Sequence, residues 1–156
     1  MSIEVNAAIP EFSPLKATSE TEVSSDTLKG QLSVLYFYPK DSTPGCTIES
    51  QDFSRLHAAF LALGCQIFGV SRDSIKSHEN FKAKQSMPFE LISDPDEVLC
   101  NAFDVMKMKN MYGKQVRGVE RSTFLIDKTG ALVNEWRQVK VPGHVEEVLE
   151  TVKGLS

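Results

Sequence analysis

The sequence predicts an α/β fold in which a mixed central β-sheet is flanked by helices. Two apolar runs, residues 32–38 and 66–71, have the length of buried strands, and a segment with helical features follows each of them. Strands that alternate with helices favour parallel pairing through right-handed crossovers. Two later apolar runs flank the turn sequence at residues 127–130, which predicts an antiparallel hairpin in the same sheet.

The first half of the chain is expected to begin the parallel core. Prolines break regular structure in residues 1–14, and polar residues make 15–23 an extended edge segment that a short turn follows. The run 32–38 has too few polar residues for a half-exposed strand, so we expect it to be central. A helix at 44–63 comes next, with a proline in its first turn and a glycine after its last.

The middle of the chain continues this alternation. A second buried strand is expected at 66–71, and Asp73 or Ser74 then caps a helix that ends near residue 86. A short strand at 89–92 leads into a turn and a helix at 96–103.

The last third adds the hairpin. Residues 107–118 are polar and contain two glycines, so we expect a long loop there. Strands at 122–126 and 131–136 flank the turn, and a helix at 145–152 ends the chain. A thioredoxin-like α/β sandwich fits this order of elements.

Length and composition limit the classes of function. A chain of 156 residues fits a single domain, residues 1–156, that can bury a core. The net charge is −4 and the basic residues are scattered, which argues against a nucleic-acid partner. No apolar run approaches the roughly 20 residues that span a bilayer, and the first residues lack the pattern of a secretory signal. We therefore expect a cytoplasmic protein with no membrane partner.

The segment between the first central strand and its helix carries the strongest functional signal. It contains Tyr38-Pro39-Lys40-Asp41-Ser42-Thr43-Pro44-Gly45-Cys46-Thr47. Cys46 falls in the first helical turn, where unpaired backbone N–H groups and the helix dipole favour a thiolate. The thiolate is the reactive form of cysteine, so Cys46 is the candidate nucleophile. The alternative is a buried structural cysteine, for which the start of a helix is a poor position.

Two motifs give the chain a family resemblance. Pro39-x-x-x-Thr43-x-x-Cys46 resembles the active-site signature of peroxiredoxins, and Thr43-Pro44-Gly45-Cys46-Thr47 with Glu49 is similar to their bacterioferritin comigratory protein (PrxQ) branch. A second match lies in residues 109–114 and 118–127, and Ser93-Asp94-Pro95 is also typical of this branch. The resemblance implies a thioredoxin-like fold. It also implies an antioxidant thiol-dependent peroxidase that reduces hydrogen peroxide and organic hydroperoxides through a cysteine sulfenic acid.

The resemblance also implies roles around the sulfur. Cys46 is the peroxidatic cysteine, Thr43 hydrogen-bonds the peroxide, and Pro39 shields the thiol. Arg121 would favour the thiolate and bind the peroxide with its fixed donors. The residues alone leave other roles open: a helix N-cap for Thr43, a strand terminator for Pro39 and a solvated surface position for Arg121.

Two further contributions are expected at the same place. The backbone N–H groups of Gly45 and Cys46 face a bound peroxide, and Gly45 places no side chain in its path. Glu49 either orients Arg121 or is a solvated helix acid. Neither a metal nor an organic cofactor is expected, because sulfur performs the chemistry.

The other cysteines leave Cys46 without a partner. Cys65 and Cys100 lie in apolar patterns and are expected to be structural, and the absence of C-x-x-C argues against a zinc site or a dithiol centre. Many relatives carry a resolving cysteine five residues after the peroxidatic one, where this chain has Gln51, and residues 74–86 contain no cysteine. We therefore expect a one-cysteine enzyme. An external thiol such as thioredoxin, glutaredoxin or glutathione would reduce it, and the resemblance implies a monomer.

Two other functions remain open at this point. A thiol–disulfide oxidoreductase would use the same scaffold, although such chemistry usually needs a neighbouring thiol. A redox sensor would use the same sulfur, and only turnover distinguishes it from an enzyme. The dispersed residues His57, His78 and His144 are expected to be surface or helix positions. Trp136 and the methionines at 106, 108 and 111 are expected to be packing or loop anchors.

Overall fold

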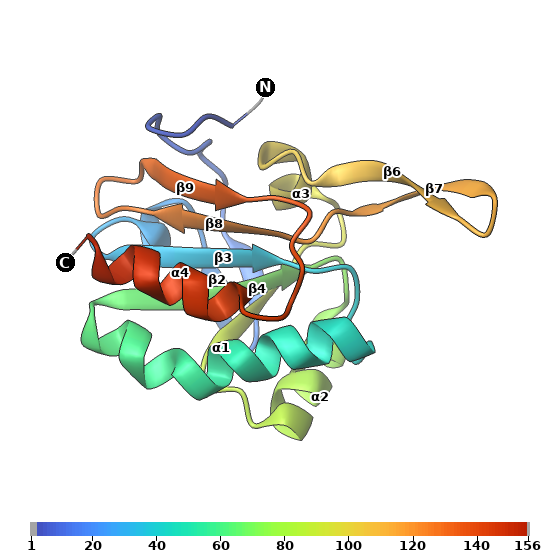
Figure 1. Ribbon diagram of the computed structural model, residues 1–156, viewed down its shortest axis with the longest axis horizontal. Coiled ribbons are helices and arrows are strands. Elements are labelled where there is room, and N and C mark those ends of the chain that lie inside the picture. Colours follow the sequence, from blue (N-terminus) through green and yellow to red (C-terminus); the bar gives the residue numbers. More distant parts are fainter. Residues whose placement is uncertain (1–2, 156) are drawn as a thin grey trace.

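The computed structural model describes residues 3–155 and confirms the predicted α/β fold. A seven-stranded sheet with the strand order β2-β1-β5-β4-β3-β8-β9 forms its centre (Figure 1). Its strands are β1 (Leu15–Ala17), β2 (Thr21–Val23), β3 (Leu32–Phe37), β4 (Cys65–Ser71), β5 (Glu90–Ser93), β8 (Ser122–Ile126) and β9 (Leu132–Trp136). The helices are α1 (Pro44–Ala62), α2 (Ile75–Gln85), α3 (Val98–Ala102) and α4 (His144–Lys153), with a 3₁₀ turn at Asp26–Leu28.

The sheet is mixed, as the sequence predicts. β3 pairs in parallel with β4, and β4 pairs in parallel with β5, so α1 and α2 are crossover helices. β8 lies antiparallel to β3, and β9 lies antiparallel to β8. Residues 15–23, expected to be one extended segment, form two short antiparallel strands, β1 and β2, at one edge of the sheet.

The two faces of the sheet cover separate apolar cores. Every residue of β3 is buried, which confirms that this strand is central. Its side chains alternate between the faces: Tyr36 packs with Phe53 of α1, while Phe37 packs with Phe103 and Phe124. Helices α1, α2 and α4 cover the first face, and α3 contributes to the second. Figure 1 shows α4 in front of the sheet and α1 beside it, lower in the view.

The two ends of α1 follow from three residues. Thr43 occupies the N-cap in an extended conformation, and Pro44 takes the first helical position, where its missing N–H costs nothing. After the last turn, Gly64 has a φ of 74°, which a glycine adopts without strain. Because β3 ends at Phe37 and α1 returns across the sheet, the first turn of α1 lies beyond the carboxyl end of β3 (Figure 1).

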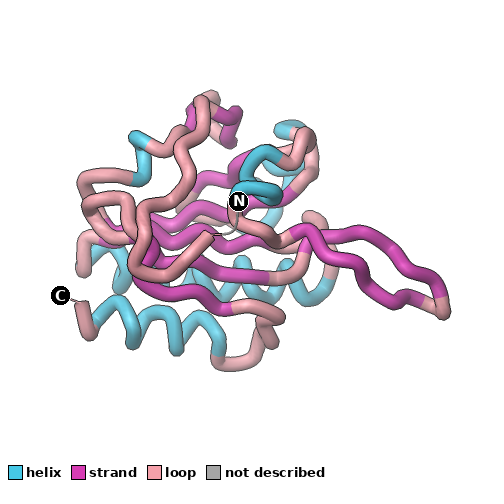
Figure 2. Tube along the Cα trace, turned by 90° about the horizontal axis from the view of Figure 1, so that it is seen from above, coloured by secondary structure: helices cyan, strands magenta, loops and turns pink. Residues whose placement is uncertain are grey.

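The prediction of a long loop at residues 107–118 is wrong. This segment forms a two-stranded antiparallel ribbon, β6 (Met106–Met111) and β7 (Lys114–Val119), joined by Tyr112 and Gly113 with φ values of 53° and 79°. Two positive φ angles are typical of a tight hairpin turn. The ribbon extends away from the seven-stranded sheet (Figures 1 and 2). Residues 106–109 alternate Met and Lys, but residues 110–119 do not continue this alternation, and the two glycines favoured a loop.

Among residues 3–155, no helix combines the length and the hydropathy that a membrane span requires.

Gly69 allows the three central strands to pack closely. It lies in β4, and a Cβ placed there would come within 2.8 Å of Cζ of Tyr36 in β3 and 2.7 Å of Cδ2 of Leu91 in β5. We expect Gly69→Ala to lower the free energy of unfolding by about 1–3 kcal/mol, because both neighbours are buried. Urea denaturation measures this loss. Gly118→Ala is the matched control, since the nearest atom there, Cδ of Lys109, lies at 3.7 Å. Equal losses in the two variants would contradict this explanation.

Candidate active site

A guanidinium joins the sheet to the first turns of α1. Arg121 immediately precedes β8, and its Nη2 donates a hydrogen bond to Sγ of Cys46 at 3.3 Å. Its Nη1 donates to Oε1 of Glu49 at 2.6 Å. Cys46 and Glu49 are three positions apart on α1, so they lie on the same helical face. The structure therefore brings Cys46, Glu49 and Arg121 together.

Strand pairing explains how Arg121 reaches this place. β8 runs antiparallel to β3, and Ser122 lies opposite Phe37, the last residue of β3. The residue before Ser122 therefore lies beside the segment that leads from β3 into α1. A backbone hydrogen bond from Val139 N to Arg121 O, 3.0 Å long, holds the same residue from the other side.

Gly45 gives the guanidinium room. A Cβ on this residue would lie 3.1 Å from Nη2 of Arg121, closer than most real contacts. The first helical hydrogen bond of α1 runs from Thr47 N to Thr43 O at 2.9 Å. The N–H groups of Gly45 and Cys46 precede it, so helical geometry offers them no carbonyl within α1.

The residues around Cys46 in the sequence differ in their exposure to solvent. Cys46 is 1% exposed, Pro39 and Thr43 are half-buried, and Pro44 is exposed. The hydroxyl of Thr43 donates to Lys40 O at 2.8 Å and makes no capping bond, although Thr43 occupies the N-cap. The prediction of an N-cap position is thus confirmed without its usual hydrogen bond.

Glu49 is fully buried, so the alternative of a solvated helix acid is wrong. Its Oε2 has no hydrogen-bond partner. Burial raises the pKa of Glu49 to about 7, because the cost of burying the charge exceeds the attraction of Arg121. Burial lowers the pKa of Arg121, but the negative charges of Glu49 and Cys46 outweigh burial and raise that pKa above its usual value.

Comparisons with known proteins identify the family of this chain. The model of the AhpC/TSA family matches residues 5–134. The chain belongs to the AhpC/TSA family. Peroxiredoxin Bcp of Xanthomonas campestris is 56% identical over 140 residues, which cover 90% of this chain and 88% of that protein. Peroxiredoxin Bcp of Bacillus subtilis is 49% identical over 156 residues, which cover 100% of this chain and 99% of that protein.

Solved structures give the same assignment. Peroxiredoxin Q of Xanthomonas campestris superposes with a TM-score of 0.90 at 51% identity, covering 96% of this chain and 98% of that one. A cysteine-to-serine variant of PrxQ from Xylella fastidiosa superposes with a TM-score of 0.93 at 46% identity, covering 97% of this chain and 96% of that one. These likenesses confirm the thioredoxin-like fold and the peroxiredoxin resemblance. The chain is accordingly a thiol-dependent peroxidase, whose family implies a peroxide substrate and a thiol reductant.

Asp41 forms a buried network that the sequence did not reveal. Its carboxylate accepts hydrogen bonds from Tyr38 Oη at 2.6 Å and Ser77 Oγ at 2.8 Å, and it lies 2.8 Å from Nδ1 of His78. Burial raises the pKa of Asp41, but the hydrogen bonds from His78 and Tyr38 outweigh it and lower that pKa. His78 lies on α2, as expected, but it is fully buried. The network therefore ties the segment before Cys46 to α2.

Within the described residues, one group of side chains could be read as a metal site. Atoms of Asp41, Asp73 and His78 that could coordinate a metal ion lie within 4.8 Å of one another. Oδ2 of Asp73 already accepts hydrogen bonds from Asp41 N and Ser71 Oγ. His78 Nε2 lies 3.0 Å from the carbonyl of Ile92. Because these hydrogen bonds already occupy the atoms that would coordinate a metal ion, we assign no metal to the group.

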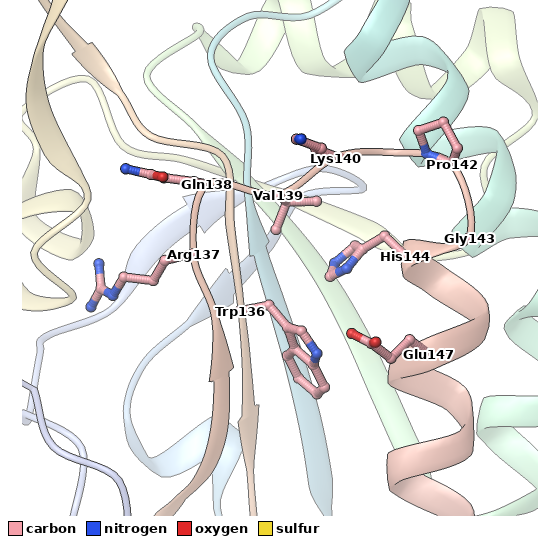
Figure 3. A pocket seen from close by; sticks show the side chains of 9 residues that line it. All are labelled: Trp136, Arg137, Gln138, Val139, Lys140, Pro142, Gly143, His144 and Glu147. Carbon is pink, nitrogen blue, oxygen red and sulfur yellow. The ribbon is translucent and has the colours of Figure 1, made fainter.

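His144 is a second buried histidine, at the start of α4. Its Nε2 lies 2.8 Å from Oγ1 of Thr123, and burial lowers its pKa to about 4. His144 lines a pocket of about 320 Å³ between the end of β9 and α4, and Trp136 and Glu147 line the same pocket (Figure 3). None of the residues predicted for the peroxidase site lines this pocket.

The raised pKa of Glu49 predicts a pH dependence of stability. The unfolded chain releases this proton near pH 4.5 and the folded chain near pH 7, so stability falls as pH rises through that interval. Glu49→Gln removes the titrating group, and we expect its free energy of unfolding to change less between these pH values. Urea denaturation at several pH values measures the slope. Glu22→Gln, at an exposed glutamate of β2, is the control and should keep the wild-type slope. A wild-type slope in Glu49→Gln would refute the assignment.

Proposed function

We propose that Cys46 is the nucleophile that reduces hydrogen peroxide and organic hydroperoxides. The contact between Arg121 Nη2 and Cys46 Sγ carries this proposal. The thiolate attacks one peroxide oxygen, the O–O bond breaks, and the sulfur becomes a sulfenic acid. The leaving oxygen takes a proton and departs as water or an alcohol. A related Xanthomonas campestris protein was studied for alkyl peroxide reduction, which supports organic hydroperoxides as substrates.

Arg121 is proposed to act on both partners of this reaction. Its positive charge beside the sulfur favours the thiolate, and its planar donors suit the charge that develops on the leaving oxygen. The ion pair with Glu49 fixes the orientation of the guanidinium. Glu49 is thus a positioning residue in this proposal.

Thr43, Pro39 and the backbone complete the proposed site. The hydroxyl of Thr43 rotates freely about its bond to Cβ, so it can exchange the Lys40 carbonyl for a peroxide oxygen. The N–H groups of Gly45 and Cys46 supply further donors in this proposal, and Pro39, which is half-buried, is assigned the role of shielding the sulfur. Because Cys46 is 1% exposed, we expect the peroxide to reach it through a local movement of this segment.

The proposal includes a one-cysteine cycle. Gln51 donates a hydrogen bond to Gln85 of α2, and α2 contains no cysteine. Cys65 lies opposite Leu32, at the other end of β3, about 16 Å along the strand from Phe37. Cys100 belongs to the core on the opposite face of the sheet. We therefore propose that an external thiol reduces Cys46, in a monomer whose site residues all come from one chain.

Burial supports structural roles for the other two cysteines. Both are fully buried. Burial raises the pKa of Cys65 to about 12, and burial together with the nearby Asp94 carboxylate raises the pKa of Cys100. A thiol with a raised pKa forms little thiolate near neutral pH, so neither one is a good attacking group for a sulfenic acid.

Peroxide consumption with a recycling thiol tests the proposed site. We expect Cys46→Ser to fall to the uncatalysed rate, because no other thiolate is available. Arg121→Ala should lose about 100-fold in kcat/KM, the usual cost of removing one donor to a developing charge. Arg55→Ala is the matched control, since Arg55 lies on α1 and pairs with Glu146. Retained activity in Cys46→Ser would refute the proposal, and one peroxide consumed per chain would indicate a sensor instead.

Mass analysis under non-reducing conditions tests the one-cysteine cycle. After one equivalent of peroxide, we expect a chain with one added oxygen on Cys46, which a sulfenic-acid reagent traps. The double variant Cys65→Ala, Cys100→Ala should still turn over with an external thiol. An intramolecular disulfide from Cys46 to either residue would overturn the one-cysteine cycle but leave the peroxidase assignment intact.

A further inference from the structure

The β6–β7 ribbon is a projecting arm with exposed apolar side chains. Figures 1 and 2 show it extending away from the rest of the molecule. Met108 is 60% exposed, Val116 is 42% exposed, and Tyr112, in the turn at its tip, is 97% exposed. Six residues per strand give the arm a length of about 17 Å. A surface of this length fits a protein partner better than a tripeptide thiol.

The arm is also basic, whereas the rest of the chain is acidic. Residues 106–119 contain four basic residues, Lys107, Lys109, Lys114 and Arg117, and no acidic residue. The whole chain has a net charge of −4, so the remaining residues together carry −8, the difference between −4 and +4. Each face of the ribbon pairs a cation with an apolar residue: Met108 lies opposite Arg117, and Lys109 lies opposite Val116. Lys107 and Arg117 form ion pairs with Asp104 and Glu97, whereas Lys114, next to the turn, forms none within residues 3–155. The tip of the arm therefore suits an acidic surface with apolar side chains.

The base of the arm adjoins the proposed active site. β7 ends at Val119, two residues before Arg121. The ammonium of Lys109 donates to the carbonyl of Val119. Burial lowers the pKa of Lys109 and the charge of Arg121 lowers it further, while Cys46 acts in the opposite direction. Lys109 is thus within electrostatic reach of both site residues, and a protein bound along the arm would lie next to Cys46.

We infer that the β6–β7 arm is the docking surface for an acidic protein that carries a redox-active dithiol and reduces Cys46. This inference rests on the proposed one-cysteine cycle. The first thiolate of the partner attacks the sulfur of the sulfenic acid, forming a mixed disulfide and releasing hydroxide, which takes a proton to give water. The second thiol of the partner then attacks the partner's first sulfur atom, which is bonded to Cys46 in that disulfide. The Cys46 thiolate is released, and the partner leaves as an oxidised disulfide.

A two-residue change at the tip of the arm tests the inference. Tyr112→Ser combined with Lys114→Glu alters exposed residues only, and Lys128→Glu, in the exposed turn between β8 and β9, is the charge-matched control. Each protein is oxidised with one equivalent of peroxide and mixed with a reduced thioredoxin of net negative charge. The same oxidised proteins are mixed separately with dithiothreitol, a small uncharged dithiol.

We expect the arm variant to lose about tenfold in the second-order rate constant for thioredoxin at low salt, and the loss to shrink in about 0.5 M NaCl. Its rates with peroxide and with dithiothreitol should equal those of wild type. An unchanged thioredoxin rate, or an equal loss with dithiothreitol, would overturn the inference. The inference would also be overturned if sedimentation showed a dimer for wild type and a monomer for the arm variant, because the arm would then bind a second copy. Failure of Cys46 to oxidise would instead refute the proposed function.

Discussion

The guanidinium of Arg121, held between the carboxylate of Glu49 and the sulfur of Cys46, is the contact on which the site depends. It joins the residue that precedes β8 to two residues of one helical turn, and Gly45 leaves the space it occupies. Within residues 3–155, Arg121 is the one ion-pair partner of the fully buried Glu49 carboxylate, so its loss would be costly in a protein interior. The same contact therefore serves the fold and the proposed chemistry.

The topology of the sheet determines where this contact forms. The right-handed crossover from β3 to β4 places the start of α1 beyond the carboxyl end of β3, and the antiparallel β8 brings Arg121 to the same place. One element therefore supplies the sulfur at a helix start, and another supplies the charge. Neither a fully parallel sheet nor a different partner for β3 would bring these two groups together.

The sequence predicted the elements that have strong local signals. The run 32–38 was long and apolar, and the helix that begins at Pro44 was bounded by a proline and a glycine, so both predictions were confirmed. The β6–β7 ribbon was missed because its strands pair only with each other and the apolar alternation of residues 106–109 does not continue beyond them. The burial of Glu49 and of His78 was also beyond reach, since their partners, Arg121 and Asp41, are 72 and 37 positions away.

The buried network of Asp41 is compatible with the proposed one-cysteine cycle. α2 contains no cysteine, and hydrogen bonds of His78 and Ser77 to Asp41 restrain movement of this helix relative to the segment before Cys46. Opening that network would expose a buried carboxylate and a buried imidazole at once, which disfavours the movement. In the proposed one-cysteine cycle, the reducing thiol comes from outside the chain. A basic arm beside an otherwise acidic body gives such a partner a defined direction of approach.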